Sequence, residues 1–174
     1  MSVSESCWMG KLKESPIGPI WIAATNIGVC RVSLWPDRER FESETARSTG
    51  RQPIFAPDMV RPAVDQLAAY FSKELTKFEL PIDWSVMTTF QEQALRAVFA
   101  IPYGRVSRYG DIARQLGKPK AVRAVGRANA TNPIPIIIPC HRVLGSDGKL
   151  HGFSAPGGLE TKAWLLRLEG SWLI

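Results

Sequence analysis

Polar and apolar residues alternate in short runs over the first part of the chain, from Lys11 to Trp35. Alternation with a period of two predicts strands that bury one face. Turn sequences at Pro16–Gly18 and Asn26–Gly28 divide the segment, so two or three antiparallel strands are expected. Residues 36–56 are rich in charged residues, Ser, Thr and Gly, and they predict a short helix or a surface loop.

A helical pattern opens at Pro57–Asp58, where apolar residues begin to recur at intervals of three or four. It continues to about Ser72 and places on one face Val60, Val64, Leu67, Ala68 and Phe71. The run Phe78–Ile82 predicts one more strand. We therefore expect residues 1–85 to form a small α/β domain, in which no side chain suggests catalysis.

The pattern changes after Asp83–Thr89, which we interpret as a linker to a second, mainly helical domain over residues 86–174. Thr89 and Glu92 form a capping box, which predicts the start of a helix. The apolar face of this helix comprises Phe90, Ala94, Leu95, Val98 and Phe99. A final amphipathic helix is predicted over Leu159–Leu168.

Two short helices with a tight turn between them are predicted in the middle of this domain. The first runs from about Tyr109 to Gly117, the second covers Ala121–Ala130, and Lys118–Lys120 form the turn. Helix, turn and helix in this order are typical of a helix-turn-helix motif that binds DNA.

The segment Thr131–Val143 combines three prolines with four isoleucines. Because proline excludes a continuous helix and isoleucine favours burial, the pattern predicts a stiff, buried and extended segment. It ends on Cys140, His141 and Arg142, which are a soft nucleophile, a proton-transfer group and a fixed cation. A rigid backbone is suited to holding a reactive atom in place.

Positive charge is concentrated in the second half of the chain. The net charge is +6; residues 1–87 carry 10 Lys/Arg against 11 Asp/Glu, whereas residues 88–174 carry 12 against 5. This asymmetry favours a polyanionic partner, nucleic acid before membrane, since no basic amphipathic helix is evident. The alternative is a basic surface without a specific partner.

The second helix of the pair carries Arg123 and Arg127 on one face, and small residues keep it slim: Ala121, Ala124, Gly126, Ala128 and Ala130. Such a helix can enter a groove of DNA, with Val122 and Val125 turned inward, although small residues also allow two helices simply to pack closely. Further cations surround the motif, namely Arg105, Arg108, Arg114, Lys118, Lys120 and Arg142. DNA binding is therefore the better interpretation.

Three cysteines without paired spacing indicate free thiols in a reducing cytoplasm. Neither a signal sequence nor an apolar run long enough for a bilayer is evident, so we expect a cytoplasmic protein without a membrane partner. Cys7 and Cys30 are expected to be small buried residues.

Cys140 can act as a nucleophile if a base or a cation lowers its pKa from ~8.5. His141 is adjacent, but neighbouring side chains of an extended segment face opposite ways, so a bridging water or a local turn is needed. A group that orients the imidazole is expected as well. Glu169 is the strongest candidate, because it ends the apolar stripe of the last helix and a buried carboxylate requires a partner.

The run R-A-V-G-R-A-N-A-T-N-P-I-P-I-I-I-P-C-H-R-V, Arg123–Val143, resembles the signature of the O6-alkylguanine-DNA alkyltransferases, which repair DNA by direct reversal. The likeness extends from about Phe90 to Trp172, and the first half matches more loosely through S-P-I-G and its strand pattern. It implies an α+β two-domain fold: a ribonuclease-H-like N-terminal domain and a winged-helix-like C-terminal domain that carries the cysteine.

The resemblance also implies roles for residues of the cysteine segment. Cys140 would accept the alkyl group, His141 would act as a base through water, and Glu169 would supply the carboxylate. Asn132 would brace the turn between the recognition helix and the cysteine segment. Tyr109 would lie near the flipped base and its 3′ phosphate.

The remaining roles concern the DNA and the base pocket. Arg123 would replace the extruded guanine in the base stack, with Ala124, Gly126, Arg127, Ala130, Arg105 and Lys120 on the DNA-binding surface. Val143, Phe153 and Ser154 would line the pocket, the valine carbonyl reading the exocyclic amine. The loop around Ser154 is longer than in some members of the family.

Alkyl transfer is displacement at carbon, which suits a soft thiolate, and a stable thioether implies one repair event per molecule. The expected substrates are O6-alkylguanine and O4-alkylthymine in double-stranded DNA, bound from the minor groove and reached by base flipping. Tyr109 would supply a proton to the leaving base. Some members of the family bind structural zinc in the N-terminal domain through cysteines and histidines. Because the only histidines, His141 and His151, lie in the second half, we expect no such zinc; no other metal and no cofactor are expected. A monomer that can bind DNA cooperatively is expected.

Three other functions fit parts of the pattern. A DNA-binding regulator would leave Cys140 structural or use it as a sensor, and would retain full activity without it. A cysteine hydrolase would turn over repeatedly. A protein of the alkyltransferase-like family would bind alkylated DNA without repair, but that family has tryptophan where Cys140 stands, which argues against it.

Overall fold

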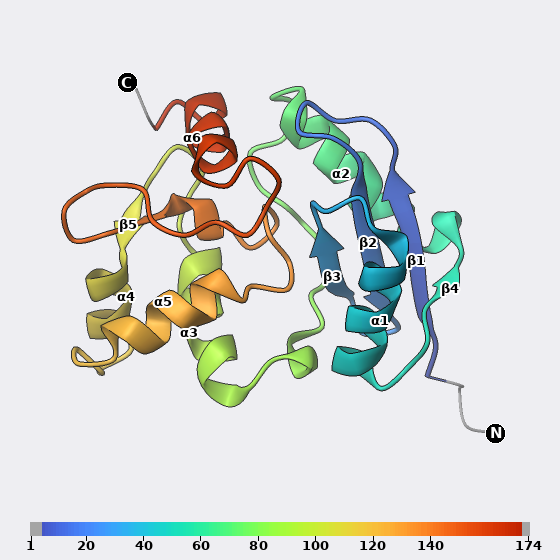
Figure 1. Ribbon diagram of the computed structural model, residues 1–174, viewed down its shortest axis with the longest axis horizontal. Coiled ribbons are helices and arrows are strands. Elements are labelled where there is room, and N and C mark those ends of the chain that lie inside the picture. The colour runs from blue at the N-terminus through green and yellow to red at the C-terminus, as the bar shows by residue number, and fades with distance from the viewer. Residues whose placement is uncertain (1–4, 172–174) are drawn as a thin grey trace. The chain divides into compact units, whose positions relative to one another are not determined.

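The structure is a computed structural model that describes residues 5–171 (Figure 1). The chain divides into two compact units between Met87 and Thr88. None of the described helices is long and apolar enough to span a membrane.

The first unit is built on a four-stranded sheet in the order β3-β2-β1-β4. Strands β1 (Cys7–Leu12), β2 (Ile20–Thr25) and β3 (Val29–Ser33) are antiparallel neighbours, which confirms the strands predicted from the alternating pattern. Strand β4 (Ile54–Phe55) pairs parallel to β1. It was not predicted, because two residues are too few to show alternation.

Helices cover the two faces of this sheet (Figure 1). Helix α1 (Arg38–Thr49) is capped by Asp37 and places Phe41 in a core with Met9 of β1. On the opposite face, Gly10 lies against the 3-10 helix η1 (Pro57–Val60). A Cβ atom at Gly10 would come within 2.5 Å of Val60, so only glycine permits this close approach.

Helix α2 (Arg61–Phe71) follows η1 and confirms the predicted helix, but its buried side chains are Ala63, Leu67 and Tyr70. Ala68, expected to be inward, is exposed. The prediction of a strand over Phe78–Ile82 was wrong, since Ile82 alone bridges to Val29. The last element of the unit is the 3-10 helix η2 (Trp84–Val86).

The second unit is mainly helical, with α3 (Thr89–Phe99), α4 (Tyr109–Gln115), α5 (Val122–Ala130) and α6 (Leu159–Leu168). All four helices were predicted. Two short parallel strands join them, β5 (Ser107–Arg108) and β6 (Val143–Leu144). The 3-10 helix η3 (Cys140–Arg142) directly precedes β6.

Two local details of the helix predictions were wrong. The N-cap of α3 is Thr88, one residue before the predicted cap, because its side chain accepts a hydrogen bond from Gln91 N. Val122 and Phe99, expected to face inward, are 41% and 37% exposed. Each lies at an end of its helix, where neighbouring elements cover less of the surface.

The segment Thr131–Val143 is buried from Pro133 onward, largely as predicted, but it is not extended. Ile134 O accepts a hydrogen bond from Ile138 N at 2.9 Å, which closes a tight turn around Ile136 at φ 71°. The prolines exclude a helix but allow a turn, and a β-branched residue in the left-handed region gives no advance signal in the sequence. All four isoleucines are at most 2% exposed.

Candidate active site and nucleic-acid interface

Cys140 lies at the start of η3, where two asparagines of the preceding segments hold the backbone. Asn132 donates to Ile138 O and accepts from Ile134 N, both at 2.9 Å, so it closes the tight turn before the cysteine. Asn129 of α5 donates to Cys140 O at 3.1 Å. Asn132 therefore holds the turn before Cys140 through these two hydrogen bonds. Asn129 adds a further contact to the backbone of Cys140, which the sequence did not reveal.

A buried ion cluster follows Cys140. His141 Nε2 is 2.7 Å from Glu169 Oε1, as predicted. Arg142 donates to both oxygens of Glu169, at 2.9 and 3.0 Å, and to Ile101 O at 2.6 Å. Burial alone would raise the pKa of Glu169, but the hydrogen bonds from His141 and Arg142 outweigh it and hold the pKa at about 2. Glu169 is therefore a carboxylate, and Arg142 belongs to its cluster, not to a DNA-binding surface.

The protonation of His141 follows from this contact. Burial lowers the pKa of His141 and Glu169 only partly opposes the shift, so the imidazole is neutral. A carboxylate can only accept, which assigns the ring hydrogen to Nε2 and a lone pair to Nδ1. Nδ1 is buried and has no hydrogen-bond partner among the described residues. This atom is available as a base.

Lys162 of α6 is a buried cation that the sequence analysis did not identify. It is 0% exposed, and its Nζ donates to Val143 O at 2.8 Å and to His151 O at 2.7 Å. Burial lowers its pKa to about 8. Its spacing from Leu165 and Glu169 places it on the buried face of α6, so the argument applied to Glu169 could have found it too.

Cys140 is 4% exposed, and the side chains of Asn132 and Lys162 act on its thiol. Burial raises the pKa of Cys140, while the side chains of Asn132 and Lys162 oppose this shift. The resting group is a thiol that needs a base, and a neutral imidazole and a cation are the groups that can favour its thiolate.

The residues expected in the base pocket are only partly brought together. Val143 is fully buried next to Cys140, and its carbonyl accepts from Lys162. Tyr109 begins α4; its hydroxyl lies 3.5 Å from His151 O, burial raises its pKa and the Asn129 side chain lowers it. Phe153 is half-buried and Ser154 is exposed. No hydrogen bond links either side chain to Cys140 within the described residues.

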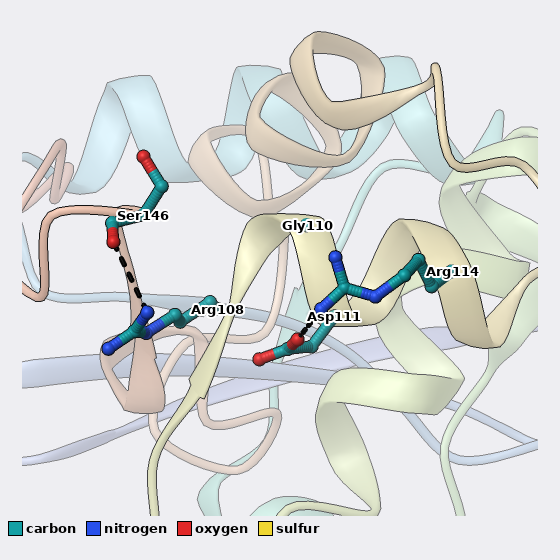
Figure 2. Close-up of a pocket in the computed structure, with 5 residues that line it drawn as sticks. All are labelled: Arg108, Gly110, Asp111, Arg114 and Ser146. Atoms are coloured by element: carbon teal, nitrogen blue, oxygen red, sulfur yellow. Dashed lines mark hydrogen bonds and ion pairs between the residues drawn. The ribbon is translucent and has the colours of Figure 1, made fainter.

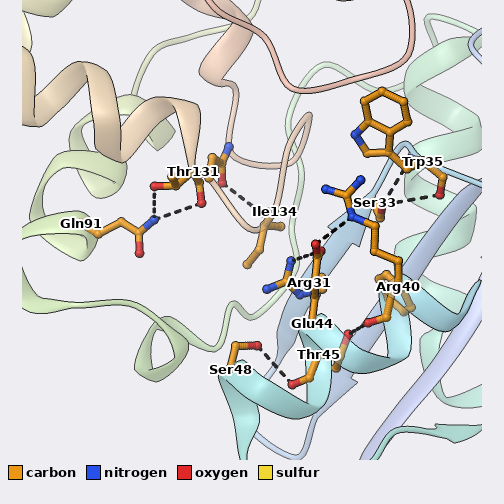
Figure 3. Close-up of polar contacts among 12 residues, drawn as sticks. Arg31, Ser33, Trp35, Arg40, Glu44, Thr45, Ser48, Gln91, Thr131 and Ile134 are labelled. Carbon is orange, nitrogen blue, oxygen red and sulfur yellow. Dashed lines mark hydrogen bonds and ion pairs between the residues drawn. The ribbon is translucent and has the colours of Figure 1, made fainter. Parts of the chain in front are cut away.

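The predicted DNA-binding residues form an exposed surface on the helix-turn-helix. The side chains of Arg105, Lys120, Ala124, Ala130 and both arginines of α5, Arg123 and Arg127, are exposed, and Gly126 is half-buried. No acidic residue in the range 5–171 forms an ion pair with any of these four cations. Gln91 joins α3 to the end of α5 by donating to Thr131 O and Oγ1, at 3.1 and 3.0 Å (Figure 3).

A cleft of about 210 Å³ lies beside the start of α4, lined by Arg108, Gly110, Asp111, Arg114 and Ser146. Arg108 donates to Ser146 O at 3.2 Å, and Arg114 pairs with Asp111 (Figure 2). The β5–β6 pairing brings these two chain segments together. Of the cations expected around the motif, Arg114 is thus neutralised within its own helix.

No group of three or more histidine, cysteine, aspartate and glutamate side chains in the described part of the chain is arranged to hold a metal ion.

Comparison with known proteins identifies the family. Residues 89–171 match the model of the 6-O-methylguanine DNA methyltransferase DNA-binding domain, and residues 10–84 match the ribonuclease-like domain of the same family. This chain belongs to the 6-O-methylguanine DNA methyltransferase family. The recognised family and the α+β two-domain fold are thereby confirmed.

Relatives within the family match over nearly their whole length. A methylated-DNA–protein-cysteine methyltransferase from Methanosarcina barkeri is 44% identical over 156 residues, which covers 90% of this chain and 93% of the relative. One from Mycobacterium tuberculosis is 42% identical over 163 residues, covering 91% and 90%. The crystal structure of Mycobacterium tuberculosis OGT in complex with DNA has a TM-score of 0.76 at 40% identity, covering 95% of this chain and 93% of that one.

Proposed function

We propose that this protein repairs double-stranded DNA by transferring the alkyl group of O6-alkylguanine, and of O4-alkylthymine, irreversibly to Sγ of Cys140. The observation that carries the proposal is a cysteine next to a neutral, buried imidazole with a free Nδ1, in a chain of this family. The unpaired cations of α5 lie in the same unit and suit the phosphates of DNA.

Activation of Cys140 begins at His141. Its Nδ1 takes the thiol proton through an intervening water, and Glu169 stabilises the imidazolium that results. Arg142 keeps Glu169 ionised and in place, which makes it a positioning residue. Lys162 offsets part of the cost of forming a thiolate in a buried site.

Transfer then follows as a displacement at carbon. The thiolate forms an S–C bond to the alkyl group, the C–O6 bond breaks, and its electron pair returns to the guanine ring. Tyr109 donates a proton to the edge of the guanine ring. The proton that His141 removed from Cys140 then returns to Tyr109, so the protein loses no net proton beyond that of the thiol. No oxidant, reductant or cofactor is required, and the thioether remains on the protein.

The substrate reaches the site by base flipping, since O6 is inaccessible within the base stack. Helix α5 enters the minor groove, Arg123 fills the gap left by the base, and Arg127, Arg105 and Lys120 contact phosphates. Val143, Phe153 and Ser154 form the pocket. We further propose that the division into residues 1–85 and 86–174 is the domain boundary, and that the protein acts as a monomer with cooperative binding along DNA.

Stoichiometry tests this function. Protein is mixed with a tenfold molar excess of duplex that carries O6-methylguanine with a labelled methyl group. The number of labelled methyl groups per protein molecule is then measured over time. We expect one methyl group per protein molecule and then no further reaction. Repeated turnover would support a hydrolase, and binding without transfer would support a regulator; either result would contradict the proposal.

A further inference from the structure

Asn129 is a buried polar residue of α5 that the mechanism above does not use. It is 4% exposed, and its Nδ2 donates to the carbonyl of Cys140 at 3.1 Å. Its Oδ1 is buried and has no hydrogen-bond partner among the described residues. A buried acceptor without a donor is costly, and nearly all such groups in folded proteins are paired. Because Nδ2 of the same amide is bonded to the carbonyl of the alkyl acceptor, the unpaired Oδ1 suggests a donor supplied by a ligand.

Asn132 provides an internal comparison three residues further along the chain. Both ends of its side-chain amide are occupied, Nδ2 by Ile138 O and Oδ1 by Ile134 N. Both Nδ2 and Oδ1 of Asn132 thus have partners in the main chain, whereas in Asn129 only Nδ2 has a partner among the described residues. Two asparagines contact the same cysteine segment, and one of them keeps a free acceptor.

The two neighbouring main-chain acceptors already have donors, unlike Oδ1 of Asn129. The carbonyl of Cys140 already accepts from Asn129, and the carbonyl of Val143 already accepts from Lys162. Each can accept a second hydrogen bond, but Oδ1 of Asn129 has accepted none. Burial raises the pKa of Tyr109 and a hydrogen bond from the Asn129 side chain opposes the rise, so the Asn129 amide is a neighbour of the residue proposed to protonate the base.

The chemistry of the substrate indicates which donor fits. Alkylation at O6 removes the N1 hydrogen of guanine, so the exocyclic 2-amino group is the N–H donor that remains on the pairing edge. It offers two hydrogens, one for a main-chain carbonyl and one for a further acceptor. O4-alkylthymine has lost the N3 hydrogen and carries no amino group, so it offers no such donor.

We propose that Oδ1 of Asn129 accepts a hydrogen bond from the 2-amino group of the flipped O6-alkylguanine, which makes Asn129 a specificity-determining residue for guanine over thymine lesions. This inference rests on the proposed alkyl transfer to Cys140. A site that pairs a substrate N–H leaves its own acceptor unpaired when the analogue lacks that group, and discriminates against the analogue.

The test compares single-turnover transfer rates from duplexes that carry O6-methylguanine or O6-methylhypoxanthine, which lacks only the amino group. For the wild type we expect the guanine substrate to react at least tenfold faster. In Asn129→Leu that ratio should fall by about tenfold, because Oδ1 is gone. Asn129→Leu also removes the hydrogen bond to Cys140 O. This loss should lower the transfer rates from both substrates by the same factor, so it does not change their ratio. O4-methylthymine should behave like O6-methylhypoxanthine.

Asn132→Leu is the matched control, and it should lower both rates equally and leave the ratio unchanged. Asn129→Ser serves if the leucine variant does not fold, since a serine hydroxyl is too short to reach the same donor. A ratio that stays at the wild-type value in the Asn129 variants would overturn the inference while transfer itself stands. If the wild-type protein accepts no methyl group from either substrate, the proposed function is overturned, and this inference with it.

Discussion

The two units of the molecule treat their arginines differently. In the first unit Arg31 and Arg40 both pair with Glu44, at 3.2 and 2.9 Å (Figure 3), and Arg38 pairs with Glu42 at 2.7 Å. Arg51 and Arg61 also have acidic partners, Glu5 and Asp58. In the second unit Arg105, Arg123, Arg127 and Lys120 are exposed without an ion pair among residues 5–171. Five arginines of the first unit thus pair with its own carboxylates. In the second unit Arg96, Arg114 and Arg142 are paired in the same way, and the four exposed cations named above are left for a polyanion.

Buried polar groups differ in the same way. The first unit buries Thr25, Thr45 and Asp83, and Thr25 donates to Asp83 at 2.6 Å. The second unit buries four ionisable side chains close to Cys140: His141, Arg142, Lys162 and Glu169. Such clusters are costly and perturb pKa values, and they concentrate at functional sites. We therefore infer that the first unit supports the fold and that the chemistry lies in the second unit.

The largest expected effect is at Cys140. Cys140→Ala should abolish methyl transfer and keep binding to alkylated duplex, whereas Cys30→Ala in the first unit should keep transfer. Single-turnover transfer and a gel-shift titration measure the two properties. Residual transfer in Cys140→Ala would show that another residue accepts the methyl group.

The next effect is on stability. Glu169→Gln leaves Arg142 buried without its carboxylate and should lower the free energy of unfolding by about 3–5 kcal/mol. The exposed pair of Glu92 and Arg96 gives the control, since Glu92→Gln should cost under about 1 kcal/mol. Urea unfolding measures both. Equal decreases in the free energy of unfolding of the two variants would mean that the buried ion cluster at Glu169 stabilises the fold no more than an exposed ion pair.

The pH dependence of stability follows from the same carboxylate. The pKa of Glu169 is depressed in the folded state, from 4.5 to about 2. Its contribution is therefore complete above about pH 4.5 and is lost as the pH falls toward 2. The wild type should lose stability over this window more steeply than Glu169→Gln. Parallel curves would contradict the assigned ionisation.

A smaller effect is expected on DNA binding. Arg123→Ala should slow repair of duplex far more than reaction with a free alkylated base, because only duplex leaves a gap in the base stack. Arg127→Ala should weaken duplex binding and reduce the log–log salt slope by about 0.9 for one phosphate contact. Arg61→Ala, in the first unit, should change neither property. Equal slowing of both substrates by Arg123→Ala would reject its role in the stack.

The smallest effect concerns Lys162. Lys162→Met removes the buried cation that favours the Cys140 thiolate, so the pH at which transfer reaches half its maximal rate should rise. The exposed Lys149 lies in the loop that precedes α6, and Lys149→Met should leave the pH profile unchanged. Transfer rates between pH 6 and 9 measure the shift, and identical profiles would remove Lys162 from the mechanism.

Much of this site was predictable, and the failures have physical causes. Glu169 was found because a carboxylate at the end of an apolar helical stripe requires a buried partner, and Lys162 carries the same signal on the same helix. The extended conformation of Thr131–Val143 was wrong, because proline excludes a helix without choosing between a strand and a turn. The free acceptor of Asn129 depends on contacts between α5 and η3, which no local pattern encodes.

The most direct test of the central claim locates the methyl group. Wild-type protein is mixed with duplex containing O6-methylguanine, its intact mass is measured, and the modified peptide is sequenced by tandem mass spectrometry. We predict the mass of one added methyl group, on Cys140, with Cys7 and Cys30 of the first unit unmodified. An unchanged mass, or a methyl group on either of those cysteines, would contradict the account.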